Sequence, residues 1–144
     1  LDAEVEKLKQ FLEMKTGGVS YNVIPIKDDM SHLILMHQAL KRNELIVINA
    51  DRTTPGSKYL EMEFLASKAK FPLGPFVLAE KFKVSVTFVY AVKGTNTHYE
   101  LFATDPLIGT SKADEVAQLY TQHLASMVKK YPTQWFNFYN YYAD

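Results

Sequence analysis

The chain lacks cysteine altogether, and it lacks an excess of charge of either sign. Zero cysteines in 144 residues exclude a disulfide framework and a thiolate metal site, although they do not fix the compartment. Lys and Arg number 16, and Asp and Glu also number 16, so no electrostatic argument favours a nucleic acid as partner. No apolar run approaches the ~20 residues that a membrane-spanning helix needs.

The common catalytic and cofactor signatures are also missing. The sequence contains no G-x-S-x-G elbow, no Walker loop, no G-x-G-x-x-G and no H-E-x-x-H. His37 and His123 fall within apolar helical stripes, where we expect hydrogen-bonded core histidines in preference to a catalytic base. His32 and His98 have no neighbouring residues that suggest metal ligation. We therefore predict neither a metal site nor a cofactor.

What the chain does have is enough apolar sequence to bury a core. Apolar residues make up 47% of it, which excludes disorder as the main state. Its length fits one domain, so we predict a single α/β domain over residues 1–144. The chain begins at Leu1 rather than at Met, which suggests that a segment of the protein precedes it.

Hydrophobic periodicity predicts an alternation of helices and strands. Apolar residues at helical spacing predict helices over 2–15 (ended by Gly17-Gly18), 30–42, 72–82 and 116–131, the last preceded by a capping box of Ser111 and Asp114. Branched or alternating apolar residues predict strands over 21–26, 44–50, 60–64, 69–71, 84–92 and 98–104.

The stretch Glu44–Ala50 is nearly continuous in apolar residues, which is typical of a central strand covered on both faces in a parallel sheet. Together with the strand at 21–26 and the helix between them, it predicts a βαβ unit with a right-handed crossover. We thus predict an α/β fold with a mixed, mainly parallel sheet flanked by helices. The strands at 84–92 and 98–104 should form an antiparallel pair.

Asp51 and Arg52 follow the predicted central strand, and a polar loop that contains Pro55-Gly56 comes after them. Open α/β sheets usually bind ligands at the carboxyl ends of their strands, and a guanidinium can hold a phosphate or carboxylate in its planar fork. The alternative is structural: Asp51 accepts backbone hydrogen bonds while Arg52 forms a surface ion pair.

Two further segments allow both a binding and a structural interpretation. A helix that begins at Pro72 would point free amides outward next to Gly74, which permits a close backbone approach; an ordinary helix start with proline explains the same residues. The aromatic segment Trp135–Tyr142 suits a membrane interface, but such a cluster also commonly covers a domain's own core.

Taken together, three blocks resemble the lipid A late acyltransferases and the related lysophospholipid acyltransferases. The blocks are Ile48–Arg52 with the Pro-Gly loop and Phe64, Ala69–Pro75 with Leu78-Ala79 and the strand that follows, and Lys130–Phe136. The resemblance implies transfer of a fatty acyl chain from acyl carrier protein or coenzyme A to a hydroxyl of a lipid acceptor. It further implies a cytoplasmic location at the inner membrane.

The resemblance also implies a His-x4-Asp or His-x4-Glu motif, in which the histidine is the general base and the acid orients it. That motif is absent here, because the residues five positions after the four histidines are His37, Arg42, Ala103 and Val128. In the family the motif lies before the region that matches Leu1, so no catalytic residue is assigned within these 144 residues.

What the resemblance carries over is a substrate-binding set: Asp51, Arg52, Phe71, Pro72 and Gly74. Arg52 stands where the lipid A enzymes usually have Gln, which leaves the acceptor open. The main alternative is a non-catalytic module that binds a lipid or an acyl carrier protein. A phosphate- or nucleotide-binding α/β domain rests only on the strand-end loop. We also expect self-association through an exposed sheet edge.

Overall fold

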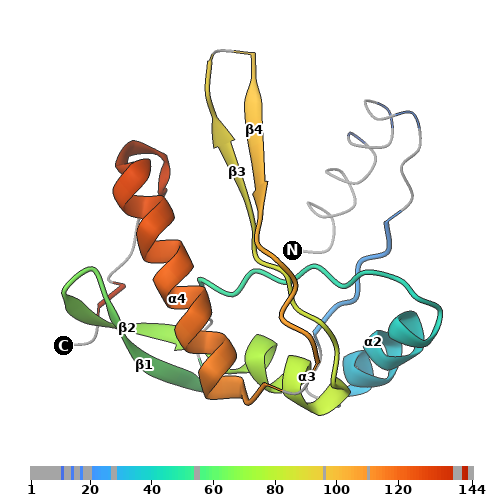
Figure 1. The fold of residues 1–144 in the computed structure, drawn as a ribbon. Coiled ribbons are helices and arrows are strands. Elements are labelled where there is room, and N and C mark those ends of the chain that lie inside the picture. Colours follow the sequence, from blue (N-terminus) through green and yellow to red (C-terminus); the bar gives the residue numbers. More distant parts are fainter. Residues whose placement is uncertain are drawn as a thin grey trace. The chain divides into compact units, whose positions relative to one another are not determined.

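The computed structural model describes residues 11, 14, 17, 21–26, 29–53, 56–95, 97–109, 111–137 and 141–142 (Figure 1). It divides into two compact units, Leu1–Ile46 and Val47–Asp144, and each is described by itself. Most of the helix predicted over 2–15 lies outside the described residues. Of that stretch, Phe11 and Met14 are described, and both are helical and exposed.

The described part of the first unit is built around helix α2, Ser31–Lys41, which confirms the helix predicted over 30–42. Asp29 caps its start by accepting the backbone N–H of Ser31 at 2.9 Å, and this hydrogen bond holds the pKa of Asp29 below its usual value. Just after the helix, the Arg42 guanidinium donates two hydrogen bonds, of 2.6 and 3.0 Å, to the Glu44 carboxylate. The hydrogen bond from Arg42 lowers the pKa of Glu44.

The predicted central strand over 44–50 is not formed, and neither is the strand over 21–26. Residues from Leu45 to Ala50 make no backbone hydrogen bond within the described part of the chain, and Leu45 and Val47 are 94% and 84% exposed. A strand exists only when a neighbour accepts its backbone groups, and no described segment lies beside this one in that way. Both strand pairs that the described residues form are antiparallel, so a mainly parallel sheet is not shown, whereas the α/β class is.

The second unit begins with a hairpin of β1, Tyr59–Phe64, and β2, Ser67–Pro72. The register pairs Leu60 with Phe71, Met62 with Ala69 and Phe64 with Ser67 on one face. Phe64, Ala69 and Phe71 on that face are at most 1% exposed. The strands predicted over 60–64 and 69–71 are therefore present, and the buried face follows their alternation.

The hairpin turn consists of Leu65 and Ala66, which have φ of 51° and 68°. Two positive values in succession are the geometry of a type I′ turn, which normally uses Asn-Gly because other residues are strained there. Strand β2 then runs one residue further than expected, through Pro72. Helix α3, Gly74–Phe82, consequently starts two residues after the predicted helix start at Pro72.

The rest of the unit is a second hairpin and a long helix. Strands β3, Val89–Lys93, and β4, Tyr99–Ala103, pair antiparallel, and a bridge between Val86 and Leu107 extends the pair, as predicted for 84–92 and 98–104. Helix α4, Ala113–Lys130, confirms the clearest predicted helix, and the 3-10 helix η1, Pro132–Gln134, follows it.

Helix α4 begins differently from the prediction of a capping box by Ser111 and Asp114. The N-cap is Lys112, and its N–H donates to the Glu115 carboxylate at 3.1 Å. The N–H of Ala113 donates to the Glu80 carboxylate at 3.0 Å. Glu80 lies on α3, so a charged acceptor from a neighbouring helix satisfies an otherwise free amide at the positive end of α4.

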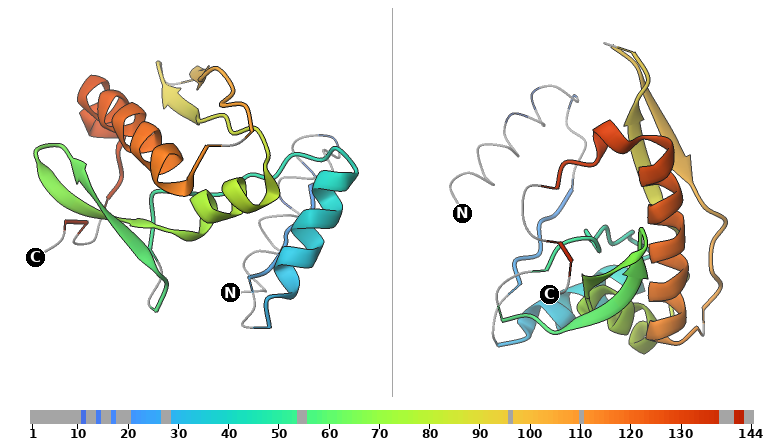
Figure 2. Two further views of the ribbon diagram at one scale, coloured as in Figure 1. Left: turned by 60° about the horizontal axis from the view of Figure 1, so that its bottom comes forward. Right: turned by 90° about the vertical axis from the view of Figure 1, so that its left-hand side faces the viewer.

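The core of this unit is aromatic. Helix α4 lies across the β1–β2 hairpin (Figure 2). Its residues Val116, Ala117, Leu124 and Val128 belong to the same buried cluster as Phe64 and Phe71 of the hairpin. Trp135 and Tyr141 pack onto Phe64 with ring centroids 5.4 and 5.6 Å away, so this part of the aromatic segment covers the domain's own core. His37 and His123 are exposed, so the prediction of core histidines is wrong, although the His123 ring lies beside the core residue Phe88 at a centroid distance of 5.8 Å.

The strained β1–β2 turn yields a stability prediction. Ala66→Gly should raise the free energy of unfolding by about 1 kcal/mol, because glycine adopts a positive φ without a Cβ clash. Ala117→Gly, in the buried face of α4, is the control with the opposite expected effect. It should lower the free energy of unfolding by at least about 1 kcal/mol. Urea unfolding measures both. A less stable Ala66→Gly variant would contradict the strain.

Tyr90 on β3 yields a prediction of pH dependence. Its hydroxyl is buried without a hydrogen-bond partner among the described residues, and burial raises its pKa to about 12. Between the ordinary value of 10.0 and about 12, the unfolded chain has lost this proton while the folded chain retains it, so stability falls as pH rises.

Tyr90→Phe should therefore lose less stability than the parent chain over that pH range. At neutral pH the variant should be equal or up to about 1 kcal/mol more stable, since an unsatisfied buried hydroxyl is removed. Tyr99→Phe is the control, because Tyr99 is 61% exposed. Identical pH profiles for the parent and Tyr90→Phe would contradict the prediction.

Candidate functional site

The loop that follows the unpaired apolar stretch presents the first two predicted site residues. The side chain of Arg52 is 62% exposed and that of Asp51 is 26% exposed, and Arg52 Nε lies 3.9 Å from Asp51 Oδ2. This contact is too long for a strong hydrogen bond, and an exposed ion pair of this kind contributes little to stability. The guanidinium fork is therefore accessible to an anionic group from solvent.

The next two predicted site residues lie inside the protein. Phe71 is fully buried and meets Phe64, Tyr120 and Tyr141 edge-on at centroid distances of 5.5, 6.2 and 5.5 Å. Pro72 is buried as well. Neither side chain offers a surface to a ligand in this arrangement, so their contribution is to anchor the backbone that leads into α3.

Gly74 is exposed, as Arg52 is, and it is the first residue of α3. A Cβ built on it would meet nothing within 4 Å, so the backbone here is open to solvent. The helix start has no side-chain cap, and Pro75 beside it has no N–H to offer. The amides of Gly74 and Phe76 thus remain as donors at the positive end of the helix.

One hydrogen bond joins the loop to the helix start. The N–H of Leu73 donates to the carbonyl of Lys58 at 3.0 Å, so the end of the 51–58 loop lies against the residue before Gly74. The structure does not describe residues 54–55, and it records no contact between Arg52 and Gly74 among the described residues. The loop and the helix start are therefore neighbours, and Arg52 is on the same loop at its far end.

The side chain of Gln134 has a role that sequence reasoning missed. Its Oε1 accepts the N–H of Lys93 at 2.7 Å, and its Nε2 donates to the carbonyl of Lys93 at 2.9 Å. The carboxamide thus bonds to β3 as the peptide group of a neighbouring strand would. Pro132 starts η1 and sets the direction of this residue, but the sequence offers no signal for its partner, which is 41 positions away.

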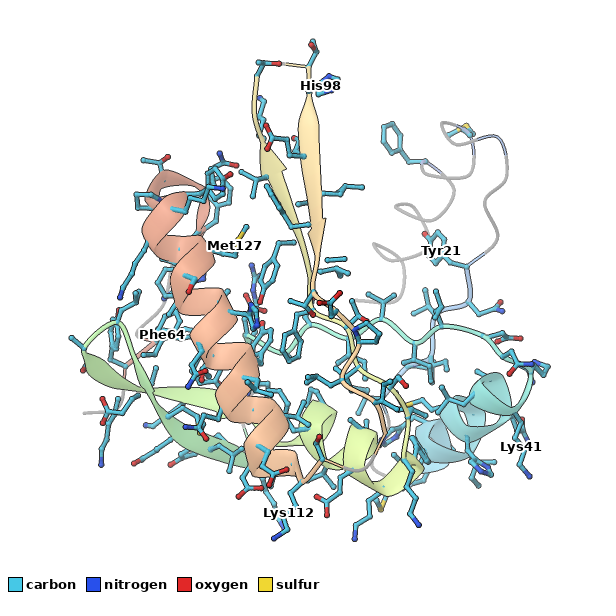
Figure 3. The ribbon with its side chains drawn as sticks, viewed as in Figure 1. Tyr21, Lys41, Phe64, His98, Lys112 and Met127 are labelled. Atoms are coloured by element: carbon cyan, nitrogen blue, oxygen red, sulfur yellow. The ribbon has the colours of Figure 1, made fainter. Side chains whose placement is uncertain are left out.

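Other features of the described residues do not suggest a reactive centre. No group of three or more His, Cys, Asp or Glu side chains among them could hold a metal ion. The small pocket lined by Ala79, Val84, Val86, Leu107, Gly109, Ser111 and Val116 contains no ionisable side chain. His98 lies at the tip of the β3–β4 hairpin (Figure 3). None of the described helices is long and apolar enough to cross a membrane.

The family described as bacterial lipid A biosynthesis acyltransferase matches the chain over residues 14–143. The match takes in both units, the 51–58 loop, the start of α3 and Gln134. No curated protein matches the chain.

Proposed function

Because the chain belongs to the bacterial lipid A biosynthesis acyltransferase family, we propose that it forms the substrate-binding part of an enzyme that acylates a lipid acceptor. The observation that carries this proposal is the extent of the match, which covers residues 14–143. In this reaction a hydroxyl oxygen of the acceptor attacks the carbonyl carbon of an acyl thioester. A general base takes the hydroxyl proton, and the thiol of the donor leaves.

The donor in our proposal is an acyl carrier protein or coenzyme A, and the acceptor is a lipid A precursor or a similar lysophospholipid. An acceptor of this kind carries phosphate, and the exposed Arg52 guanidinium suits a phosphate because its paired N–H groups match two oxygens. The free amides at the start of α3 suit the same charge. The start of α3 is held by the buried residues Phe71 and Pro72 that precede it.

The location that follows from a lipid acceptor is the cytoplasmic side of the inner membrane, with the protein bound peripherally. Exposed apolar side chains support a lipid-facing surface in the second unit. Leu101 on β4 is 81% exposed, and Phe136 after η1 is 66% exposed. Large apolar side chains at the surface favour contact with a membrane or another protein.

The second candidate function is a non-catalytic module that binds a lipid or an acyl carrier protein. The observation that favours it is the missing base, because none of the four histidines has an acid five positions later. His37 and His123 are also exposed on separate helices. The two proposals differ in whether the protein that contains this chain also supplies a His-x4-acid motif.

The missing base yields a prediction about activity. The 144 residues alone should show no acceptor-dependent release of thiol from an acyl carrier protein thioester or acyl coenzyme A, since none of the four histidines has an acid five positions later to orient it as a base. The assay uses a lysolipid and a lipid A precursor as acceptors. Turnover that disappears in His37→Ala or His123→Ala would show that a histidine within the chain is the base.

Arg52 yields a prediction about the acceptor. In an active enzyme that contains this chain, Arg52→Ala should lower kcat/KM for a phosphorylated acceptor by roughly ten- to a hundredfold, which corresponds to a charge-assisted hydrogen bond of about 1.5–3 kcal/mol. Arg52→Lys should recover only part of the loss, because an ammonium lacks the paired donors.

Arg42→Ala is the matched control, since Arg42 is also exposed but its guanidinium is engaged by Glu44. Its kinetics should be unchanged. Melting temperatures of all three variants separate binding from structure. If Arg52→Ala lowers the melting temperature sharply while acceptor kinetics stay normal, Arg52 holds its own loop and does not bind the acceptor.

A further inference from the structure

The extended segment Val84–Val92, which overlaps β3, has one edge whose backbone N–H and C=O groups make no hydrogen bond to the described residues. Every second residue of this segment, beginning with Val86, directs its backbone hydrogen bonds to β4 or to the residues that follow β4. Val86 and Leu107 exchange two bonds of 3.1 and 2.8 Å, the carbonyl of Phe88 accepts the N–H of Thr104, and Gly94 donates to His98. In an antiparallel pair the intervening residues direct their N–H and C=O groups to the opposite side. These residues, here termed the open edge, are Ser85, Thr87, Val89 and Ala91.

The residues of the open edge are exposed, and their backbone groups have no hydrogen-bond partner among the described residues. All four side chains are exposed, with Val89 at 65%, and no backbone hydrogen bond from these residues to any described residue is present outside the β3–β4 ladder. The next outward-directed residue, Lys93, is already satisfied on both groups by the Gln134 carboxamide. Gln134 therefore marks where the open edge stops.

The sequence of this strand lacks the charges and the proline that often prevent pairing at a free edge. Natural proteins guard a free edge with charges, proline or a bulge. The nine residues Val84–Val92 read VSVTFVYAV and contain no charged residue, no proline and no glycine. The first charge along the edge is Lys93, and there the edge is already closed by Gln134.

We propose that the open edge pairs antiparallel with the open edge of a second copy of this chain. Since Gln134 occupies Lys93, the register that uses all four open residues places Thr87 opposite Val89 of the second copy and Ser85 opposite its Ala91. Each such pair joins two residues whose backbone groups both point outward, so each exchanges two hydrogen bonds. The residues 85–91 that pair in this register carry no charge, so no like charges meet among them.

The second copy fits this edge because the pairing is self-complementary. A twofold axis perpendicular to the sheet passes between the two strands at Phe88, and the same patch serves both copies. The outcome is one four-stranded sheet in the order β4, β3, β3, β4. Side chains opposite each other point to the same face, so the exposed row of Val89 and Leu101 becomes continuous across both copies.

Cross-linking tests the register directly, because the parent chain has no cysteine. The double variant Thr87→Cys/Val89→Cys should form a covalent dimer on mild oxidation, since hydrogen-bonded antiparallel pairs have a Cα separation of about 5.5 Å that suits a disulfide. The matched control is Leu101→Cys/Ala103→Cys, which has the same spacing on the same face of β4. It should stay monomeric on a non-reducing gel.

Sedimentation of the full 144-residue chain tests the equilibrium. The parent chain should dimerise, and Thr87→Lys/Val89→Lys should weaken the dimer by about tenfold or more, because each new ammonium lies opposite another. Leu101→Lys/Ala103→Lys should have a dissociation constant within about threefold of the parent. Circular dichroism of each variant verifies that the hairpin is retained, and the cross-linking result stands independently if a lysine variant fails to fold.

Three results would overturn the proposal. One is a parent chain that stays monomeric at the highest soluble concentration. Another is equal cross-linking of the β3 and β4 cysteine pairs, which would indicate random collision. The third is pairing of the open edge with the apolar stretch Leu45–Asn49, which a covalent link between Ile46→Cys and Thr87→Cys would reveal.

Discussion

The packing of Phe64 and Phe71 against the C-terminal aromatic residues is the constraint on which the second unit depends. Isolated two-stranded hairpins are marginal in water, and β1–β2 persists because its inner face is closed by Trp135, Tyr141 and α4. Edge-on ring pairs add to the area they bury, by about 0.5–1.5 kcal/mol each. The C-terminal segment also bonds to β2, where the N–H of Lys70 donates to the carbonyl of Tyr141 at 3.3 Å. Residues distant in sequence thus make one core.

That core also accounts for the separation of roles within the candidate site. Phe71 and Pro72 are consecutive with Leu73 and Gly74, yet the first two are buried and Gly74 is exposed. The buried pair fixes the backbone, and the exposed residue begins α3 with free amides. The bond between Leu73 and Lys58 transmits the same rigidity to the end of the 51–58 loop. A ligand bound there would meet groups whose positions are set before binding, which reduces the ordering cost.

Local patterns in the sequence predict those parts of the fold that depend on neighbouring residues. Helices α2 and α4 and the β3–β4 hairpin follow from periodicity and alternation, because their hydrogen bonds close over short stretches. The 44–50 stretch has the composition of a central strand, but a strand also requires partners, and composition does not supply them. For the same reason the sequence locates Arg52 on a loop but leaves open whether it meets Gly74. Gln134 and Glu80 bond to residues 41 and 33 positions away, which no local pattern encodes.

Trp135 is the only tryptophan of the chain. Because it lies in the aromatic core, its fluorescence reports on the environment of that core. Its ring lies 5.0 Å from Tyr141 and 5.4 Å from Phe64, nearly perpendicular to the former. The emission wavelength of the indole shifts when water replaces these neighbouring rings. The fluorescence therefore reports the unfolding of the second unit alone. Far-ultraviolet dichroism also includes α2 of the first unit. If the two signals changed at different denaturant concentrations, the two units would unfold separately, and no added label would be needed to detect it.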